Sequence, residues 1–210
     1  MSVTPPEIAN GGSNPPEVIQ TEDFTELLFT GSQSTGFEAT VTSDTAIAAS
    51  KPVKEADITV KTSKGETVVL GIQATKVAKS EIKNEGNGSL DMKVRTGSFL
   101  KNTVTGGKNS DSVSFGTQTK LKKVDADLGE GDDSVTFGKN TEFKGKSTFD
   151  LGEGGADAVK FKSKTGPDSG KIVFKNVDEN DTFQFKKKTF TGAEVAAKEK
   201  FDNIKIEFAD

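Results

Sequence analysis

The sequence contains no cysteine and no histidine, a single arginine (Arg95), and no aromatic residue other than phenylalanine. Without cysteine the chain can form no disulfide, and pairing gives no information on its redox compartment. The absence of histidine and cysteine excludes imidazole acid–base catalysis, thiol nucleophiles and the commonest zinc sites. Because there is also no long insertion that would build a cleft, we expect a protein that is not an enzyme.

Long apolar runs are missing too, which excludes a helix that spans a membrane. The first residues, 1–7, have neither a basic start nor an apolar block, so they do not resemble a secretory signal peptide. The net charge is −4, from 28 basic and 32 acidic side chains, and no basic stripe is interleaved with stacking aromatics. We therefore expect no nucleic-acid partner.

What the sequence does contain is a short pattern that returns every 21 to 24 residues: an acid, any residue, an apolar residue, any residue, and an aromatic or apolar residue. A fixed period of this length is typical of stacked repeats rather than of a globular domain without internal repeats. Hydrophobic residues make up 31% of the chain, which fits a thin core one or two side chains deep. The first apolar residues of the successive copies are Met92, Val113, Val135, Val159, Phe183 and Ile204.

These patterns predict an all-β fold, a parallel β-solenoid or β-roll-like stack of 21–24-residue coils. Each repeat has two strand candidates, the patterned strand and a second one at 124–128, 147–151 or 172–174. Because side chains alternate between the faces of a strand, equivalent residues of successive coils should stack in inner ladders. The aromatic ladder would consist of Phe115, Phe137, Phe161 and Phe185. The alternative is an antiparallel sandwich with chance regularity.

A glycine-rich corner that ends in an aspartate precedes each of these patterned strands. The segments 106–114, 128–136 and 152–160, and more distantly 176–184, resemble the RTX family of calcium-binding repeats, whose nonapeptide is Gly-Gly-x-Gly-x-Asp-x-apolar-x. The resemblance implies Ca²⁺ held by carboxylates and backbone carbonyls. The residues that it assigns to the metal are Asp111, Asp133, Asp157, Asp181, Gly106, Gly129, Gly131, Gly152 and Gly155.

The physical basis of a calcium row is that stacked coils would place the four aspartates in one column. Carboxylates at that spacing repel one another unless something neutralises them, and calcium between the corners would do so. Glycine permits a positive φ, so that the corner can turn its carbonyl oxygens towards an ion. The alternative is a set of tight turns whose aspartates accept hydrogen bonds from backbone amides and need no ion.

The chain departs from the family pattern because each coil has one such corner, while the opposite edge is rich in lysine. A lysine-rich edge can be a solvated face that prevents a sheet edge from aggregating. It can also be a patch for an acidic partner, such as a surface polysaccharide or lipid headgroups. The lysines of this edge are Lys139, Lys144, Lys146, Lys162, Lys164, Lys186, Lys187 and Lys188.

The chain divides into a flexible or docking arm (1–20), an N-terminal cap or β region (21–88) and the solenoid of repeats (89–210). Prolines and glycines argue against regular structure in the arm. Within the second region, residues 24–28 are compatible with one or two helical turns.

Two further elements are expected between the arm and the repeats. Residues 37–41 predict a strand. Residues 56–72 predict a β-hairpin, because apolar and polar residues alternate on both sides of Lys64-Gly65.

The function that these patterns favour is a non-enzymatic structural solenoid on an exterior surface: a secreted, RTX-like surface or adhesion protein, stiffened by calcium and exported without an N-terminal signal peptide. The alternative is a decoration or appendage subunit of a bacteriophage virion, attached to a protein platform through residues 1–50. A third interpretation is a polysaccharide-active solenoid. Whether the chain forms a homo-oligomer stays open at this stage.

Overall fold

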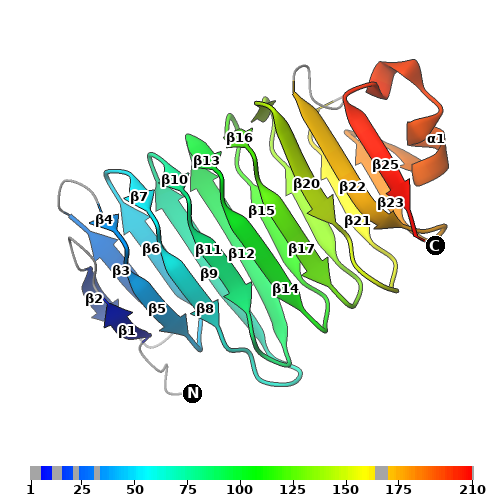
Figure 1. The fold of residues 1–210 in the computed structure, drawn as a ribbon. Coiled ribbons are helices and arrows are strands. Elements are labelled where there is room, and N and C mark those ends of the chain that lie inside the picture. Colours follow the sequence, from blue (N-terminus) through cyan, green and yellow to red (C-terminus); the bar gives the residue numbers. More distant parts are fainter. Residues whose placement is uncertain (1–5, 11–15, 21–23, 31–33, 164–169, 210) are drawn as a thin grey trace.

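The computed structural model describes residues 6–10, 16–20, 24–30, 34–163 and 170–209. In these residues the chain winds into a β-solenoid of about seven turns, with 58% strand and 4% helix (Figure 1). The predicted fold class, a parallel β-solenoid, is confirmed. No helix in the described part of the chain is long and apolar enough to cross a membrane.

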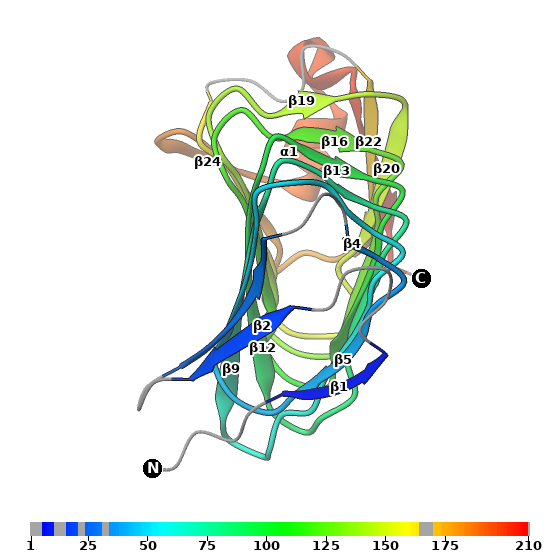
Figure 2. The ribbon, with the colours of Figure 1, turned by 90° about the vertical axis from the view of Figure 1, so that its left-hand side faces the viewer.

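Each complete coil adds one strand to each of three sheets, so the cross-section of the solenoid has three sides (Figure 2). We name these sheets A, B and C in the order in which a coil visits them. Sheet A contains, in spatial order, β1 (Glu7–Asn10), β5 (Glu38–Val41), β8 (Asp57–Val60), β11 (Glu81–Asn84), β14 (Thr103–Gly107), β17 (Asp125–Gly129), β20 (Lys146–Asp150), β22 (Lys171–Val177) and β25 (Ile204–Phe208).

Sheets B and C complete each coil. Sheet B contains β2 (Glu17–Gln20), β3 (Thr25–Phe29), β6 (Thr45–Ala49), β9 (Thr67–Ala74), β12 (Ser89–Thr96), β15 (Ser112–Phe115), β18 (Ser134–Phe137), β21 (Ala158–Phe161), β23 (Thr182–Phe185) and β24 (Lys188–Thr191). Sheet C contains the short strands β4 (Ser34–Thr35), β7 (Val53–Lys54), β10 (Val77–Ala78), β13 (Ser98–Leu100), β16 (Lys120–Lys122) and β19 (Glu142–Phe143).

The predicted aromatic ladder is confirmed. Phe115, Phe137, Phe161 and Phe185 occupy the same register position in β15, β18, β21 and β23, and each is at most 3% exposed. Their ring centroids lie 5.7, 4.8 and 4.8 Å apart along the stack. The parallel ladder of Val113, Val135, Val159 and Phe183 is confirmed by the same register. Alternation along each strand therefore places like side chains above one another inside the solenoid.

The second strand candidates correspond to β17, β20 and β22, but each coil also has a third side that the sequence pattern missed. The strands of sheet C contain two or three residues each, which is too short for alternation to be recognised. The predicted position of the last copy of the repeat, at Ile204, is also wrong. Ile204 pairs with Ile172 in sheet A instead of stacking on Phe183 in sheet B.

Three local expectations upstream of the repeats need correction. Residues 25–29 form strand β3 rather than helical turns, since they pair in parallel with β6. The expected hairpin is absent, because β8 joins sheet A and β9 joins sheet B on either side of Lys64-Gly65. The arm contains strands β1 and β2, although its prolines and glycines predicted no regular structure. The strand expected at 37–41 is confirmed as β5.

The two ends of the solenoid are finished differently. At the C-terminal end β24 turns back antiparallel to β23, followed by helix α1 (Gly192–Ala196) and the 3₁₀ helix η1 (Glu199–Phe201). The ring of Phe201 stacks on Phe185 at 4.2 Å and so closes the aromatic ladder. At the N-terminal end β1 and β2 pair antiparallel with β5 and β3. Parallel pairing runs from β3 onward, and thus begins before the boundary that we placed at residue 88.

Candidate functional site

The four predicted aspartates form one buried column at the corner between sheets A and B. We call Asp111, Asp133, Asp157 and Asp181 the Asp column. Each residue immediately precedes a strand of sheet B, and each is only 1–2% exposed. The corner that leads out of sheet A turns the chain inward at this point, so the carboxylates face the interior of the solenoid instead of solvent. The structure therefore brings these four predicted residues together.

Hydrogen bonds link the column from coil to coil. The backbone N–H of Asp111 donates to Oδ1 of Asp133 at 2.6 Å, that of Asp133 to Oδ1 of Asp157 at 2.7 Å, and that of Asp157 to Oδ1 of Asp181 at 2.8 Å. The first member continues the series, since Oδ1 of Asp111 accepts the N–H of Leu90 at 2.5 Å. Every carboxylate thus satisfies a backbone donor of the preceding coil that would otherwise be buried without a partner.

The second carboxylate oxygens differ along the column. Oδ2 of Asp111 accepts the N–H of Gly107 at 2.5 Å, and Oδ2 of Asp181 accepts that of Asp178 at 2.8 Å. Oδ2 of Asp133 is buried and has no hydrogen-bond partner among the described residues. The two ends of the column are therefore better supplied with donors than its centre.

This difference appears in the acidity of the groups. Burial raises the pKa of Asp133 to about 8 and that of Asp157 to about 7, because removal from water disfavours the charged form. Neighbouring carboxylates raise both pKa values further, while the backbone hydrogen bonds lower them. Burial also raises the pKa of Asp111 and of Asp181. Near pH 7 the centre of the column is at least partly protonated, which relieves repulsion between its members.

The glycines of the corner are required by close stacking of the backbone. Gly152 has φ +90°, and a Cβ added there would lie 1.4 Å from the carbonyl oxygen of Gly129 in the preceding coil. A Cβ on Gly129 would approach the carbonyl oxygen of Gly107 to 2.0 Å, and one on Gly155 that of Gly131 to 2.0 Å. The predicted Gly106 is equally confined, because its Cβ would lie 2.0 Å from the carbonyl oxygen of Leu128. These positions have a structural role that does not depend on a metal ion.

Few oxygen atoms at this corner are available as ligands for calcium. No three carboxylates of the described residues come together as a metal-binding group, and the Oδ1 atoms of the column already accept backbone N–H groups. Oδ2 of Asp133 is a fully buried oxygen of the column without a hydrogen-bond partner among the described residues. The hydrogen-bonded alternative thus matches the observed contacts, and calcium binding stays a prediction.

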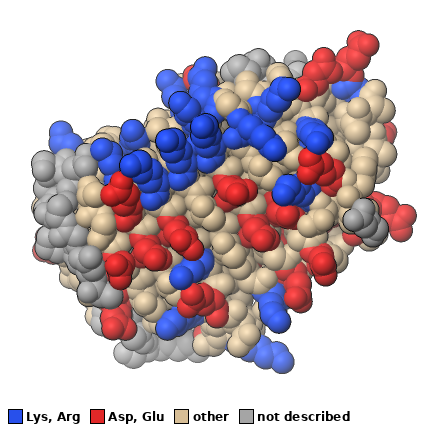
Figure 3. Space-filling model, viewed as in Figure 1, with Lys and Arg blue, Asp and Glu red and all other residues tan. Residues whose placement is uncertain are grey.

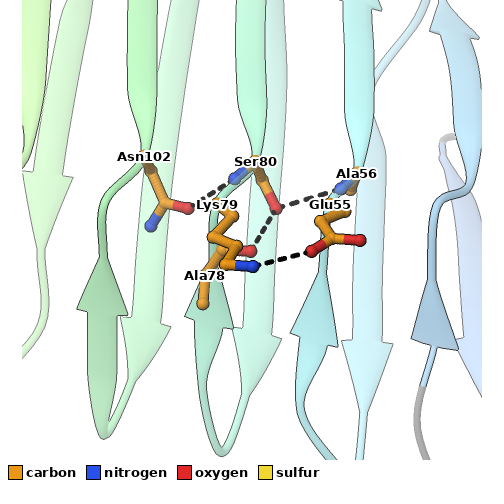
Figure 4. Close-up of polar contacts among 6 residues, drawn as sticks. All are labelled: Glu55, Ala56, Ala78, Lys79, Ser80 and Asn102. Atoms are coloured by element: carbon orange, nitrogen blue, oxygen red, sulfur yellow. Dashed lines mark hydrogen bonds and ion pairs between the residues drawn. The ribbon is translucent and has the colours of Figure 1, made fainter.

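A second buried polar row, which we did not predict, lines the corner between sheets C and A (Figure 4). The N–H of Ser80 donates to Oδ1 of Asn102 at 2.9 Å, and the N–H of Ala56 donates to Oγ of Ser80 at 3.1 Å. The amide of Asn102 donates in turn to the carbonyl of Val77 at 3.2 Å. Ser80 and Asn102 are 22 residues apart, one repeat length, and this spacing could have predicted the row. Single polar residues at that distance are too common in the sequence to be distinctive.

The lysines that we assigned to one edge lie at two corners. Lys144 and Lys146 flank the turn from sheet C into sheet A, whereas Lys162 and Lys186 follow strands of sheet B. Lys164 lies outside the described residues. Basic side chains also gather in a row along the upper part of the face shown in Figure 3, above a zone richer in acidic side chains.

Comparison with protein-family models, with curated proteins and with solved structures finds no match for this chain. The sheet topology defines the class of the fold, a three-sided parallel β-solenoid. The resemblance to RTX repeats stays a prediction.

Proposed function

We propose that this chain is a non-enzymatic structural protein, a β-solenoid displayed on an exterior surface as a secreted surface or adhesion protein. The observation that carries the proposal is that the buried side chains hold neighbouring coils together. Buried carboxylates, the side chains best suited to chemistry here, are bonded to the backbone of the neighbouring coil. The core is a stack of equivalent positions filled by apolar side chains, as in the aromatic ladder from Phe115 to Phe185. Such an architecture supplies stiffness and long, regular outer faces.

Surface display can be tested with antibodies raised against the purified chain. Intact source cells or particles and the surrounding medium are compared with a lysate, and protease treatment of intact material serves as a second readout. We expect labelling of intact material and loss of the signal after protease treatment. Detection in the lysate alone would contradict display, and release of reducing ends from acidic glycans by the purified chain would contradict the non-enzymatic assignment.

Calcium stiffening belongs to this proposal as its second component. The orphaned Oδ2 of Asp133 supports it, because a buried carboxylate oxygen without a donor is stabilised by a cation. The raised pKa of the central aspartates provides the competing solution, in which a proton takes the place of the cation. The two solutions differ in what they predict for added calcium: a bound cation raises the melting temperature, whereas a bound proton leaves it unchanged.

A subunit of a bacteriophage virion is the second candidate function. It is favoured by the N-terminal end, where β1 and β2 extend the first coil and Val18, Ile19 and Phe24 are 44%, 36% and 41% exposed. Exposed apolar side chains beside an edge strand are suited to a protein platform. Deleting residues 1–20 should then abolish attachment to purified particles while the far-UV circular dichroism of the body persists. Attachment that survives the deletion would count against this role.

A further inference from the structure

Sheet C and the residues that flank it carry an unusual concentration of positive charge. The segments 51–55, 76–79, 98–101, 120–123 and 142–146, which contain β7, β10, β13, β16 and β19, hold ten lysines and two glutamates. The whole chain has a net charge of −4, so its charges are strongly separated between faces. We call the outer surface of these five segments the basic face. It includes part of the row of basic side chains visible in Figure 3.

The lysines of the basic face follow the register of the coils. Lys79, Lys101 and Lys123 occupy the same corner position in three successive coils, with φ values of 56°, 55° and 54°. The N–H of Lys79 donates to the carbonyl of Leu100 at 3.0 Å, and the N–H of Lys101 donates to that of Lys122 at 2.7 Å. Parallel strands repeat at about 4.8 Å, so the three side chains start from points spaced by that distance.

Lysine at this corner costs stability in two ways. A residue other than glycine with positive φ is strained by about 1–2 kcal/mol, and like charges on adjacent strands repel. The corner also accepts other residues, since Glu55 takes the same conformation with φ of 53°, and Gly36 and Gly145 take it with φ of 71° and 75°. Residues that work against stability at a repeated surface position indicate a role in binding.

Protection of a sheet edge does not explain these lysines. The edge strands of sheet C are β4 and β19, whereas Lys79, Lys101 and Lys123 flank the interior strands β10, β13 and β16. Interior strands already have both neighbours, so charge there is not needed to prevent pairing with another chain. A solvated face that only blocks aggregation would place its charge at the ends of the sheet.

Much of the positive charge is also uncompensated. Glu55 pairs with Lys79 at 3.0 Å, and Glu142 lies 3.9 Å from both Lys120 and Lys144. Within the described part of the chain, no ion pair engages the remaining lysines of the face. These are Lys51, Lys54, Lys76, Lys101, Lys122, Lys123 and Lys146.

The basic face is hollowed where the lysines are densest. An open hollow of about 470 Å³ is bordered by Lys54, Lys76, Lys101 and Lys122 among others, and Ala78 and Leu100 line its apolar part. The phenylalanines of this side, Phe99 and Phe143, are 0% and 2% exposed, so no aromatic ring of these strands offers a stacking platform for a base. The surface therefore combines point charges at regular intervals with a shallow apolar floor.

We propose that the basic face docks an acidic polysaccharide, with carboxylate or sulfate groups of successive sugars against successive coils and the apolar faces of sugar rings over Ala78 and Leu100. A polyuronate carries one carboxylate per sugar, so an extended chain laid along the solenoid presents a series of negative charges to the series of lysines. Lysine supplies a hydrated point charge without the planar fork of arginine, which suits many weak, exchangeable contacts. The inference deepens the proposed function by naming its partner, and rests on the premise that the rigid body is displayed outside.

The test uses polygalacturonate as the probe and the full chain as the protein. Binding is measured by titration calorimetry at 10 mM and 150 mM NaCl, since exposed charges act over about 30 Å at the lower salt and about 8 Å at the higher. We compare the wild type with the triple variant K79Q/K101Q/K123Q and with a matched control, K61Q/K64Q/K108Q, which removes the same charge near the corner between sheets A and B. We expect the first variant to lose about tenfold in affinity at low salt and the control to change by less than about twofold.

Two further probes decide what class of partner the face prefers. Dextran, which is uncharged, should not bind, and duplex DNA should bind more weakly than polygalacturonate. Equal loss in both triple variants, no binding by the wild type, or DNA binding as tight as that of polygalacturonate would overturn the proposal. Circular dichroism and melting of each variant show whether it is folded, so that a loss of binding can be distinguished from unfolding. A folded wild type without affinity contradicts this inference alone, whereas material found only inside cells contradicts the proposed function.

Discussion

The backbone N–H of Asp133 donates a hydrogen bond of 2.7 Å to Oδ1 of Asp157, a residue 24 positions further along the chain. The bond joins one coil to the next through a side chain, at a corner where no sheet ladder supplies an acceptor. Asp133 in turn provides Oδ1 for the N–H of Asp111. Its other oxygen, Oδ2, has no partner among the described residues. The residue therefore does two separable things: it accepts a bond, and it brings a buried acidic group.

Replacing Asp133 by asparagine separates these two effects. Asn keeps Oδ1 as an acceptor for Asp111 but has no charge to bury, so at pH 8 D133N should be more stable than the wild type. The gain should be at least about 1.4 kcal/mol, the equivalent of one pKa unit. D133A should instead lose about 1–3 kcal/mol, because the N–H of Asp111 is left buried and unpaired. Urea unfolding monitored by circular dichroism measures both changes.

The control for this pair is Asp132→Asn. Asp132 is exposed and accepts the N–H of Ala156 at 2.9 Å, a bond that asparagine preserves. This variant removes the same charge one residue away and should change stability by less than about 0.5 kcal/mol. If D132N stabilises the protein as much as D133N, burial of the carboxyl group is not the cause.

The raised pKa values also predict how stability depends on pH. In the folded state Asp133 and Asp157 have pKa values of about 8 and about 7, well above the value near 4 of an unfolded aspartate. Between these limits the folded state binds more protons than the unfolded state, so the free energy of unfolding should fall as pH rises from about 4 to about 8. The stability contributed by these protons is complete below pH 4 and lost above pH 8.

Melting temperatures in calcium-free buffer at pH 4.5, 6, 7 and 8.5 provide the measurement, with D133N/D157N as the comparison. The double variant should show a flatter profile across this window, since two of the groups that take up protons are gone. A wild-type stability that rises with pH through the same range would contradict the assignment of buried, protonated carboxyl groups.

Calcium is predicted to act on the same groups. A cation bound at the orphaned oxygen of Asp133 would replace the proton, so its effect should be largest near pH 8, and calcium at one hundred times its dissociation constant would add about 2.7 kcal/mol. We expect the melting temperature of the wild type to rise with CaCl₂ relative to EDTA, and that of D133N/D157N to stay unchanged. Magnesium serves as the control, because it demands a stricter octahedral set of oxygens. A wild type that melts at the same temperature in CaCl₂ and in EDTA would contradict calcium binding. The Asp column would then be stabilised by protonation and by backbone hydrogen bonds alone.

The stacking of the coils could be predicted where the sequence repeats bulky or unusual residues. Phe115, Phe137, Phe161 and Phe185 recur at 22–24 positions, and their ladder is confirmed. The coil before Met92 has Leu70 and Ile72 at the equivalent interior positions, where any apolar residue packs, so the sequence pattern no longer reveals the period although the sheets continue. The register depends on the volume of the inward side chains and on their alternation with outward ones, and neither requires the same residue type in every coil.

The candidate site could be predicted only as a set of positions. The spacing shows that Asp111, Asp133, Asp157 and Asp181 stack, but whether their oxygens meet an ion or an N–H depends on backbone directions within the corner. Of the lysines on the basic face, only Lys144 and Lys146 were named from the sequence, because the short strands of sheet C, two or three residues each, give no recognisable pattern. The lysines of this face come from five separate segments that only the coil geometry brings together.

Burial in the aromatic ladder predicts that Phe137 is far more sensitive to truncation than Phe208, an exposed phenylalanine outside the ladder. Phe137 is 1% exposed and contacts the rings of Phe115, Phe149 and Phe161 among others, so F137A should cost about 3–5 kcal/mol. Phe208 is 52% exposed, and F208A should cost less than about 1 kcal/mol. Urea midpoints of the two variants measure the difference, and a comparable loss at both positions would show that the ladder is not the core of the body.

The glycines of the corner can be tested by a pair of substitutions two residues apart. Gly152 has φ +90° and leaves no room for a Cβ, which would lie 1.4 Å from the carbonyl oxygen of Gly129. Gly154 has φ +76°, but a Cβ there meets nothing within 4 Å. We expect G152A to lose about 3 kcal/mol or more, because the two coils must separate, and G154A to lose about 1 kcal/mol from backbone strain alone. Both variants keep every carboxylate, so their urea midpoints report on the stacking of the backbone. If G152A is as stable as G154A, the coils are not in contact at this corner, and the register that aligns the Asp column fails with them.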